Sequence, residues 1–115
     1  MPTTPPDPED AKLVTLARAT RARTGAPEGA AVRDADGRTY AACTVDLPSL
    51  RLTALQLAVA MAVSSGAPGI EAAAVVTERS EVDETDLSAV RDVGGSGRPV
   101  LLADSAGSVL RTSPT

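Results

Sequence analysis

The stretch GAAVRDADGRTYAACTV, residues 29–45, decides the predicted fold. Two short apolar runs, residues 29–33 and 38–45, flank the tetrapeptide Asp34-Ala35-Asp36-Gly37. An Asp-Gly pair supplies the positive φ angle that a tight turn between two strands requires. The stretch therefore predicts a β-hairpin.

A buried helix and a central strand are predicted after the hairpin. The tripeptide Leu47-Pro48-Ser49 ends the second strand, and the helix is expected to begin at Leu52 and to end at Ser65. This helix carries Ala, Leu, Val and Met on nearly all faces, so we expect the sheet on one side and a second subunit on the other. Residues 72–77 form a continuous apolar run, which is typical of a central strand covered on both faces.

The remaining segments complete a sheet that is covered by helices. Asp7 predicts the N-cap of a first helix, which is expected to end near Arg23. A short third helix is expected after Asp83, and strands are predicted at residues 100–103 and 108–111. This order of elements predicts an α/β fold, a three-layer α-β-α sandwich with a mixed five-stranded sheet.

The length and composition fit one small domain. The 115 residues predict a single domain at residues 7–112, with a disordered tail at residues 1–6 and a short tail at residues 113–115. Tyr40 is the only aromatic residue, so the core must consist of Ala, Val and Leu. Such side chains bury less area each than aromatic ones, which favours further burial between subunits.

The charge and the rare residue types exclude several classes of function. The net charge is −4 and Lys12 is the only lysine, which argues against a nucleic-acid partner. The chain has no His and only one Cys, Cys43, so it offers neither a thiolate cage nor a disulfide. The longest apolar stretch, residues 52–63, is shorter than the roughly 20 residues that span a bilayer, and no signal peptide is recognised. We expect no membrane association and a cytoplasmic location.

Several short motifs occur in the order and spacing of a known family. They are Gly29-Ala30-Ala31-Val32 before Asp36-Gly37-Arg38, then Cys43-Thr44-Val45-Asp46, Leu52-Thr53 and Ala72-Ala73-Ala74-Val75-Val76. In these motifs the chain resembles the small, usually homotetrameric, zinc-dependent cytidine deaminases. The resemblance is strongest in the middle of the chain and implies the cytidine deaminase-like fold.

The resemblance also implies where catalytic residues should lie. In the family, a Cys-Ala-Glu tripeptide follows the Leu-Thr pair, and its Cys binds zinc while its Glu moves protons. The corresponding residues here are Leu55, Gln56 and Leu57. The family motif Pro-Cys-x-x-Cys supplies two further thiolates, whose positions fall at Glu84 and Leu87. A leucine has neither a lone pair nor an exchangeable proton, so we interpret the chain as a degenerate member without zinc, without another cofactor and without a catalytic residue.

The resemblance further indicates a pocket. The family grips the ribose with an Asn-x-Glu-Asn stretch, where this chain has Thr44-Val45-Asp46-Leu47. The predicted pocket residues are Thr44, Asp46, Gln56 and Glu84. The amide of Gln56 lies in the most apolar helix, so it needs a partner at a subunit interface or at the pocket mouth.

An acidic cluster precedes and opens the third predicted helix. It consists of Glu81, Asp83, Glu84 and Asp86, whose carboxylates are of the type that binds Mg²⁺ or Ca²⁺. Their spacing matches no calcium loop. The favoured interpretation is a capped, solvated helix start.

Two hypotheses of function follow. The favoured one is a non-catalytic cytidine deaminase-like protein with a structural, regulatory or protein-binding role. It would form a homodimer or homotetramer through the helix that begins at Leu52 and ends at Ser65, and would have an unidentified protein partner. The alternative is an active hydrolase or deaminase, or a binder of nucleoside-like small molecules, that uses a remodelled pocket.

Overall fold

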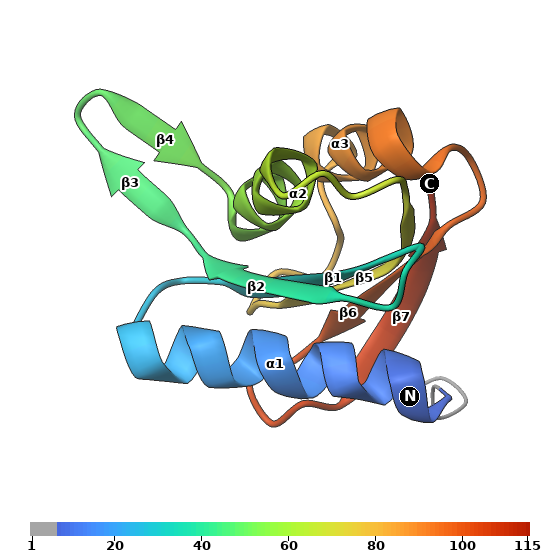
Figure 1. Ribbon diagram of the computed structural model, residues 1–115. Helices are drawn as coiled ribbons and strands as arrows, with labels where there is room; N and C mark the ends of the chain where they lie inside the picture. Colours follow the sequence, from blue (N-terminus) through green and yellow to red (C-terminus); the bar gives the residue numbers. More distant parts are fainter. Residues whose placement is uncertain (1–6) are drawn as a thin grey trace.

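A mixed five-stranded sheet forms the middle layer of the molecule (Figure 1). The computed structural model describes residues 7–115, so the tail predicted at residues 1–6 lies outside the described residues. In spatial order the strands are β2 (Thr39–Cys43), β1 (Gly29–Asp34), β5 (Ile70–Val76), β6 (Pro99–Ala103) and β7 (Val109–Pro114). The strands β5 and β6 run parallel, and the other neighbouring pairs are antiparallel. The predicted sheet is confirmed, with β5 at its centre.

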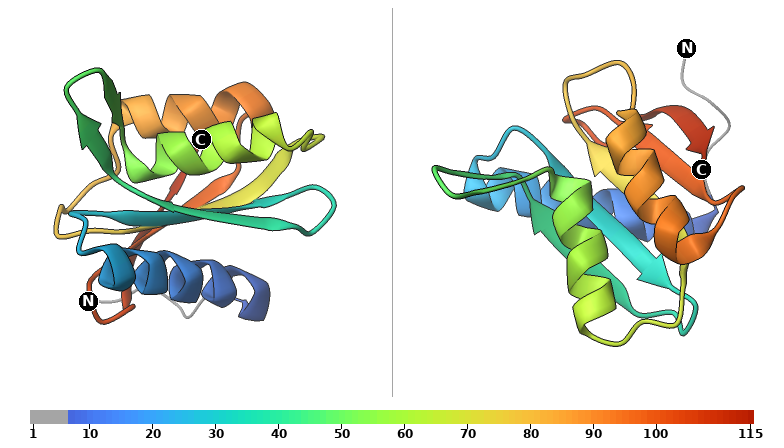
Figure 2. Two further views of the ribbon diagram at one scale, coloured as in Figure 1. Left: turned by 60° about the vertical axis from the view of Figure 1, so that its left-hand side comes forward. Right: turned by 90° about the horizontal axis from the view of Figure 1, so that it is seen from above.

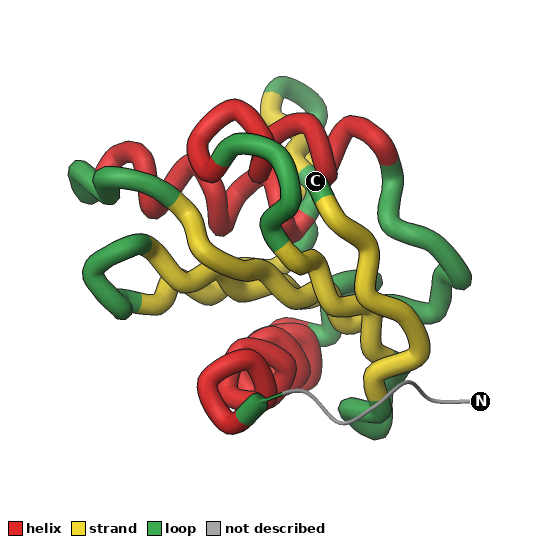
Figure 3. The backbone as a smooth tube through the Cα atoms, turned by 90° about the vertical axis from the view of Figure 1, so that its right-hand side faces the viewer, coloured by secondary structure: helices red, strands yellow, loops and turns green. Residues whose placement is uncertain are grey.

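Helices cover both faces of the sheet. The helix α1 (Pro8–Thr24) lies on one face, whereas α2 (Ala54–Ser64) and α3 (Glu84–Gly94) lie together on the other (Figures 1 and 3). Each interface has its own core of small and medium apolar side chains. Leu13 and Ala17 of α1 belong to the core on one face, and Leu55 and Ala58 of α2 belong to the core on the opposite face. The predicted three-layer α-β-α sandwich is therefore confirmed.

The bounds of α1 follow from local signals. The side chain of Asp7 accepts a hydrogen bond from the backbone N–H of Asp10 at 2.9 Å, as an N-cap residue does. At the other end, Gly25 adopts a φ of +69° and donates its N–H to the carbonyl of Arg21. Both predicted ends of this helix are confirmed.

The hairpin β1–β2 is closed by the predicted turn. One carboxylate oxygen of Asp34 accepts the backbone N–H groups of Asp36 and Arg38, each at 2.9 Å. The other oxygen accepts the hydroxyl of Tyr40 at 2.8 Å. Gly37 has a φ of +87°, which a residue with a side chain rarely adopts. The Asp-Gly signal therefore identified the turn correctly.

A second hairpin was not predicted. It consists of β3 (Val45–Leu47) and β4 (Leu50–Leu52), and it projects away from the body of the molecule (Figures 1 and 2). The single strand predicted over residues 38–45 is wrong in its end, because β2 stops at Cys43. The helix predicted from Leu52 begins at Ala54, because Thr53 is its N-cap.

The end of the chain also differs from the prediction. The strand β7 continues to Pro114, paired along β6, rather than ending at residue 111. The N–H of Thr115 donates to the carbonyl of Arg98 at 2.9 Å, and its hydroxyl donates to the carbonyl of Gly95 at 2.7 Å. The tail predicted at residues 113–115 is therefore wrong, because these residues complete the sheet.

Candidate functional site

A cleft of about 560 Å³ opens where β1 begins and β5 ends. Gly29 pairs with Val76 across these strands, so the residue before β1 and the residues after β5 meet there. The second hairpin and the start of α2 form the other walls. The lining residues are Arg21, Pro27, Glu28, Thr44, Val45, Asp46, Arg51, Leu52, Thr53, Gln56, Thr77, Glu78 and Arg79.

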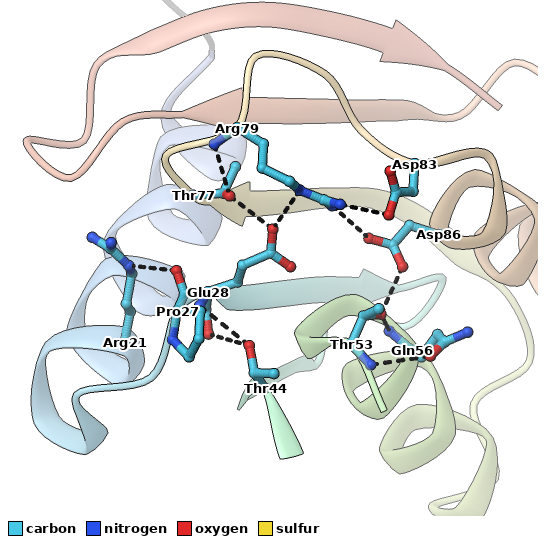
Figure 4. Close-up of polar contacts among 10 residues, drawn as sticks. All are labelled: Arg21, Pro27, Glu28, Thr44, Thr53, Gln56, Thr77, Arg79, Asp83 and Asp86. Carbon is cyan, nitrogen blue, oxygen red and sulfur yellow. Dashed lines mark hydrogen bonds and ion pairs between the residues drawn. The ribbon is translucent and has the colours of Figure 1, made fainter. Parts of the chain in front are cut away.

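Glu28 is a buried carboxylate in this cleft (Figure 4). Its Oε2 accepts the hydroxyl of Thr77 at 2.7 Å and lies 3.0 Å from Nε of Arg79. Its backbone N–H donates to the hydroxyl oxygen of Thr44 at 3.2 Å, and its carbonyl accepts the N–H of Thr44. Glu28 is thus fixed from both sides, by β5 and by the segment after β2.

Arg79 lies among three carboxylates. Besides Glu28, it contacts Asp83 through Nη1 at 2.5 Å, and its Nη2 lies 4.0 Å from Oδ2 of Asp86 (Figure 4). The hydrogen bond to Asp83 is the main cause that raises the pKa of Arg79, and the charges of Glu28 and Asp86 act in the same direction. The guanidinium therefore stays charged at any relevant pH.

Asp86 joins the starts of α2 and α3. It is fully buried in the first turn of α3, and its Oδ1 accepts the hydroxyl of Thr53 at 2.6 Å. Among the described residues, its Oδ2 has no hydrogen-bond partner. Burial is the main cause that raises the pKa of Asp86, and the charges of Glu28 and Asp83 raise it further. The interpretation of this segment as a solvated helix start is wrong for Asp86.

Thr53 and Gln56 form a capping box at the start of α2. The hydroxyl oxygen of Thr53 accepts the backbone N–H of Gln56, and the Oε1 of Gln56 accepts the backbone N–H of Thr53, both at 3.0 Å. This arrangement satisfies two backbone donors that a helix start leaves free. Gln56 lines the cleft, and the polar partner of its amide oxygen is the N-cap backbone of its own helix.

The other predicted pocket residues differ in their positions. Thr44 and Asp46 line the cleft, and Asp46 also forms an exposed ion pair with Arg51 across the second hairpin at 3.3 Å. Glu84 does not line the cleft. Its carboxylate instead accepts hydrogen bonds from Ser88 and Arg91 along the exposed side of α3. The prediction of Glu84 as a pocket residue is therefore wrong, because its helix turns it away.

The four positions that the family resemblance assigned to zinc ligands and to the proton-transfer residue lie in the first turns of α2 and α3. Leu55 is fully buried in the core, and Leu57 and Leu87 are partly buried and pack against the same core. Of these four side chains, only that of Glu84 has an atom that could bind a metal ion. Within residues 7–115, no group of three or more His, Cys, Asp or Glu side chains is placed to hold a metal ion. These side chains do not fit a zinc site.

Sequence reasoning did not assign five residues to this site: Glu28, Thr53, Thr77, Arg79 and Asp86. One local signal was present, because Thr53-Ala54-Leu55-Gln56 matches the Ser/Thr-x-x-Glu/Gln pattern of a capping box. The contacts of Glu28 with Thr77 and of Asp86 with Thr53 connect segments that are distant along the chain, whereas Arg79 also contacts the nearby Thr77 and Asp83.

No helix in the part of the chain that the structure describes has the length and apolar character to span a membrane.

Comparison with known proteins gives one family and a set of solved structures. The family model described as "Cytidine deaminase-like" matches residues 6–107. The structure of cytidine deaminase from Burkholderia pseudomallei is similar over 89% of both chains, with 24% identity and a TM-score of 0.77. That of cytidine deaminase from Mycobacterium leprae is similar over 88% of this chain and 90% of that chain, with 21% identity and a TM-score of 0.69.

A third solved structure is that of cytidine deaminase from Mycobacterium tuberculosis, with 25% identity and a TM-score of 0.67. The similarity covers 77% of this chain and 80% of that chain. The search of curated proteins found no match.

Proposed function

Because the chain belongs to the cytidine deaminase-like family, we propose that it is a member without deaminase activity, which has a structural, regulatory or protein-binding role. The observation that carries this proposal is the chemistry of the first turns of α2 and α3. Three of the four positions that resemble the family's zinc and proton-transfer residues are leucines, at Leu55, Leu57 and Leu87. The fourth, Glu84, is engaged with Ser88 and Arg91.

The chemistry of deamination supports the proposal. Zinc lowers the pKa of a bound water to about 7, which supplies hydroxide at neutral pH. A family enzyme needs thiolate or imidazole ligands to hold that ion. The chain has no His, and its single Cys, Cys43, is the last residue of β2. None of its side chains replaces the metal in making a nucleophile.

Zinc content and cytidine turnover test the proposal. Elemental mass spectrometry of the untagged, metal-replete protein is expected to give zinc near background. Incubation with cytidine is expected to give no more uridine than the heat-denatured protein, while a zinc-loaded cytidine deaminase serves as the positive control. About one zinc per chain, with cytidine conversion that a chelator abolishes, would contradict the proposal.

The alternative of a hydrolase or nucleoside-like ligand binder receives less support. Of the polar groups on which it depends, Asp46 and Gln56 line the cleft, but Asp46 is paired with Arg51 and Gln56 caps α2. Glu84 lies outside the cleft. The cleft also contains no aromatic residue that would stack on a base, because Tyr40 does not line it.

Self-association through α2 is part of the proposal. Residues 52–69 carry no charged side chain, and α2 turns only one side to the sheet. Its other side exposes Met61 and Val63, and a shallow hollow there is lined by Leu57, Ala60, Met61, Ser64 and Ser65. The second hairpin exposes Leu47 and Leu50 as well. Apolar surface of this kind favours a protein contact. We also propose a cytoplasmic location and an unidentified protein partner.

Replacing Met61 with aspartate is expected to convert an oligomer into a monomer, because a charge would then be buried in the contact. Analytical ultracentrifugation of Met61→Asp and of the unmodified chain measures the change. The matched control is Leu110→Asp, which places the same charge at an exposed leucine on β7 and is expected to leave the mass unchanged. A monomeric unmodified chain, or equal masses for all three proteins, would refute self-association through α2.

A further inference from the structure

Side chains connect the starts of α2 and α3 directly, because the hydroxyl of Thr53 donates to Asp86. We propose that Arg79 is the cation that joins these two helix starts to the sheet. The inference rests on the proposed function, since a zinc ion bound at these helix starts would be a second link between them.

A continuous series of contacts connects four elements through Arg79 (Figure 4). Glu28, at the start of β1, lies 3.0 Å from Nε of Arg79. Asp83 and Asp86, at the start of α3, face Nη1 and Nη2. Asp86 in turn accepts the hydroxyl of Thr53, the N-cap of α2. Thr77, after β5, donates to Glu28 and accepts the backbone N–H of Arg79 at 3.1 Å.

The shape of a guanidinium suits this position. Each of the three nitrogens of Arg79 faces a different carboxylate, which a planar fork allows and a single ammonium group does not. Two of the carboxylates belong to buried side chains, since the side chain of Asp86 is 1% exposed and that of Glu28 is 11% exposed. A buried carboxylate destabilises the folded chain unless a positive partner or hydrogen bonds compensate its charge. Arg79 is the cation that these residues contact.

The burial of its partners separates this cluster from an ordinary surface ion pair. The side chain of Arg79 is 42% exposed, and an exposed pair would contribute little to stability. Removing Arg79, however, leaves Glu28 and Asp86 buried without their counter-charge, and an uncompensated buried charge strongly lowers the free energy of unfolding. The chain contains a matched surface pair, because Arg111 contacts Glu81 at 3.4 Å and both side chains are mostly exposed.

Thermal unfolding of Arg79→Met and Arg111→Met tests the inference. We expect Arg79→Met to lower Tm by about 10 °C and Arg111→Met by about 1 °C. The double variant Arg79→Met with Glu28→Gln is expected to recover part of the loss, because it removes one of the two buried charges that Arg79→Met leaves unpaired. Addition of a chelator is expected to leave the Tm of the unmodified chain unchanged.

Equal Tm values for Arg79→Met and Arg111→Met would overturn the inference, as would losses that simply add in the double variant. If Arg79→Met does not fold, Arg79→Lys is compared with Arg111→Lys. A loss of about 5 °C at position 79 alone then supports the inference, and equal values overturn it. Zinc bound to the purified chain would refute the proposed function itself. If the purified chain binds no zinc and Arg79→Met lowers Tm no more than Arg111→Met does, this inference alone is refuted.

Discussion

Replacing Gly29 with alanine is expected to unfold the chain or to lower its Tm by more than about 15 °C. Gly29 begins β1 directly beneath α1. A Cβ atom at this position would lie 2.1 Å from the carbonyl oxygen of Ala17 and 2.9 Å from Cβ of Arg21. Both are parts of the helix that cannot rotate away, so α1 would have to move off the sheet. Such a shift costs about 4 kcal/mol or more, a large share of the stability of a small domain.

The matched control is Gly69→Ala. A Cβ atom at Gly69 meets its nearest atoms at 3.8 and 3.9 Å, which is ordinary contact distance. Circular dichroism and chemical denaturation of both variants measure the difference. Gly69→Ala is expected to stay within about 0.5 kcal/mol of the unmodified chain. If Gly29→Ala unfolds at the same denaturant concentration as Gly69→Ala, helix α1 does not approach β1 as closely as described.

Replacing Leu55 with alanine is expected to lower the free energy of unfolding by about 3 kcal/mol, or Tm by about 10 °C. Leu55 is fully buried in the core between α2 and the sheet. This core consists largely of Ala and Val, so Leu55 is one of its few large side chains. Truncation removes apolar contacts and leaves a cavity that the small neighbours cannot fill.

Leu57→Ala is the control for this prediction. Leu57 is on the same helix but only partly buried, so its truncation is expected to cost about 1 kcal/mol. Urea denaturation with equal slopes for both variants measures the two costs. Equal losses of unfolding free energy would mean that Leu55 contributes no more to the core than Leu57 does. The expected difference matters for function, because it shows that the position resembling a zinc ligand now contributes to packing.

The fold of this chain does not by itself fix the chemistry of its side chains. The chain belongs to the cytidine deaminase-like family, and the side chains at its two helix starts contribute to a core and to an ion-pair cluster. A fold hosts an activity only where the site residues supply it. At the start of α3 the structure places Asp86 4.0 Å from Nη2 of Arg79.

The sequence by itself determined the elements that rest on local signals. The N-cap at Asp7, the turn at Asp34-Ala35-Asp36-Gly37 and the central strand at residues 72–77 follow from neighbouring residues alone. Each depends on backbone geometry or on a hydrophobic period of a few residues, which is readable without knowledge of the rest of the chain.

Only the tertiary structure decided the burial of Asp86, the position of Glu84 and the cluster around Arg79. Asp86 resembles a solvated acid in its local sequence, yet it is buried because α2 packs beside α3 and Thr53 meets it across 33 residues. Glu28 meets Thr77 across 49 residues. A buried charge is stabilised by partners that the fold brings from distant segments, and such partners leave no periodic signal in the sequence around it.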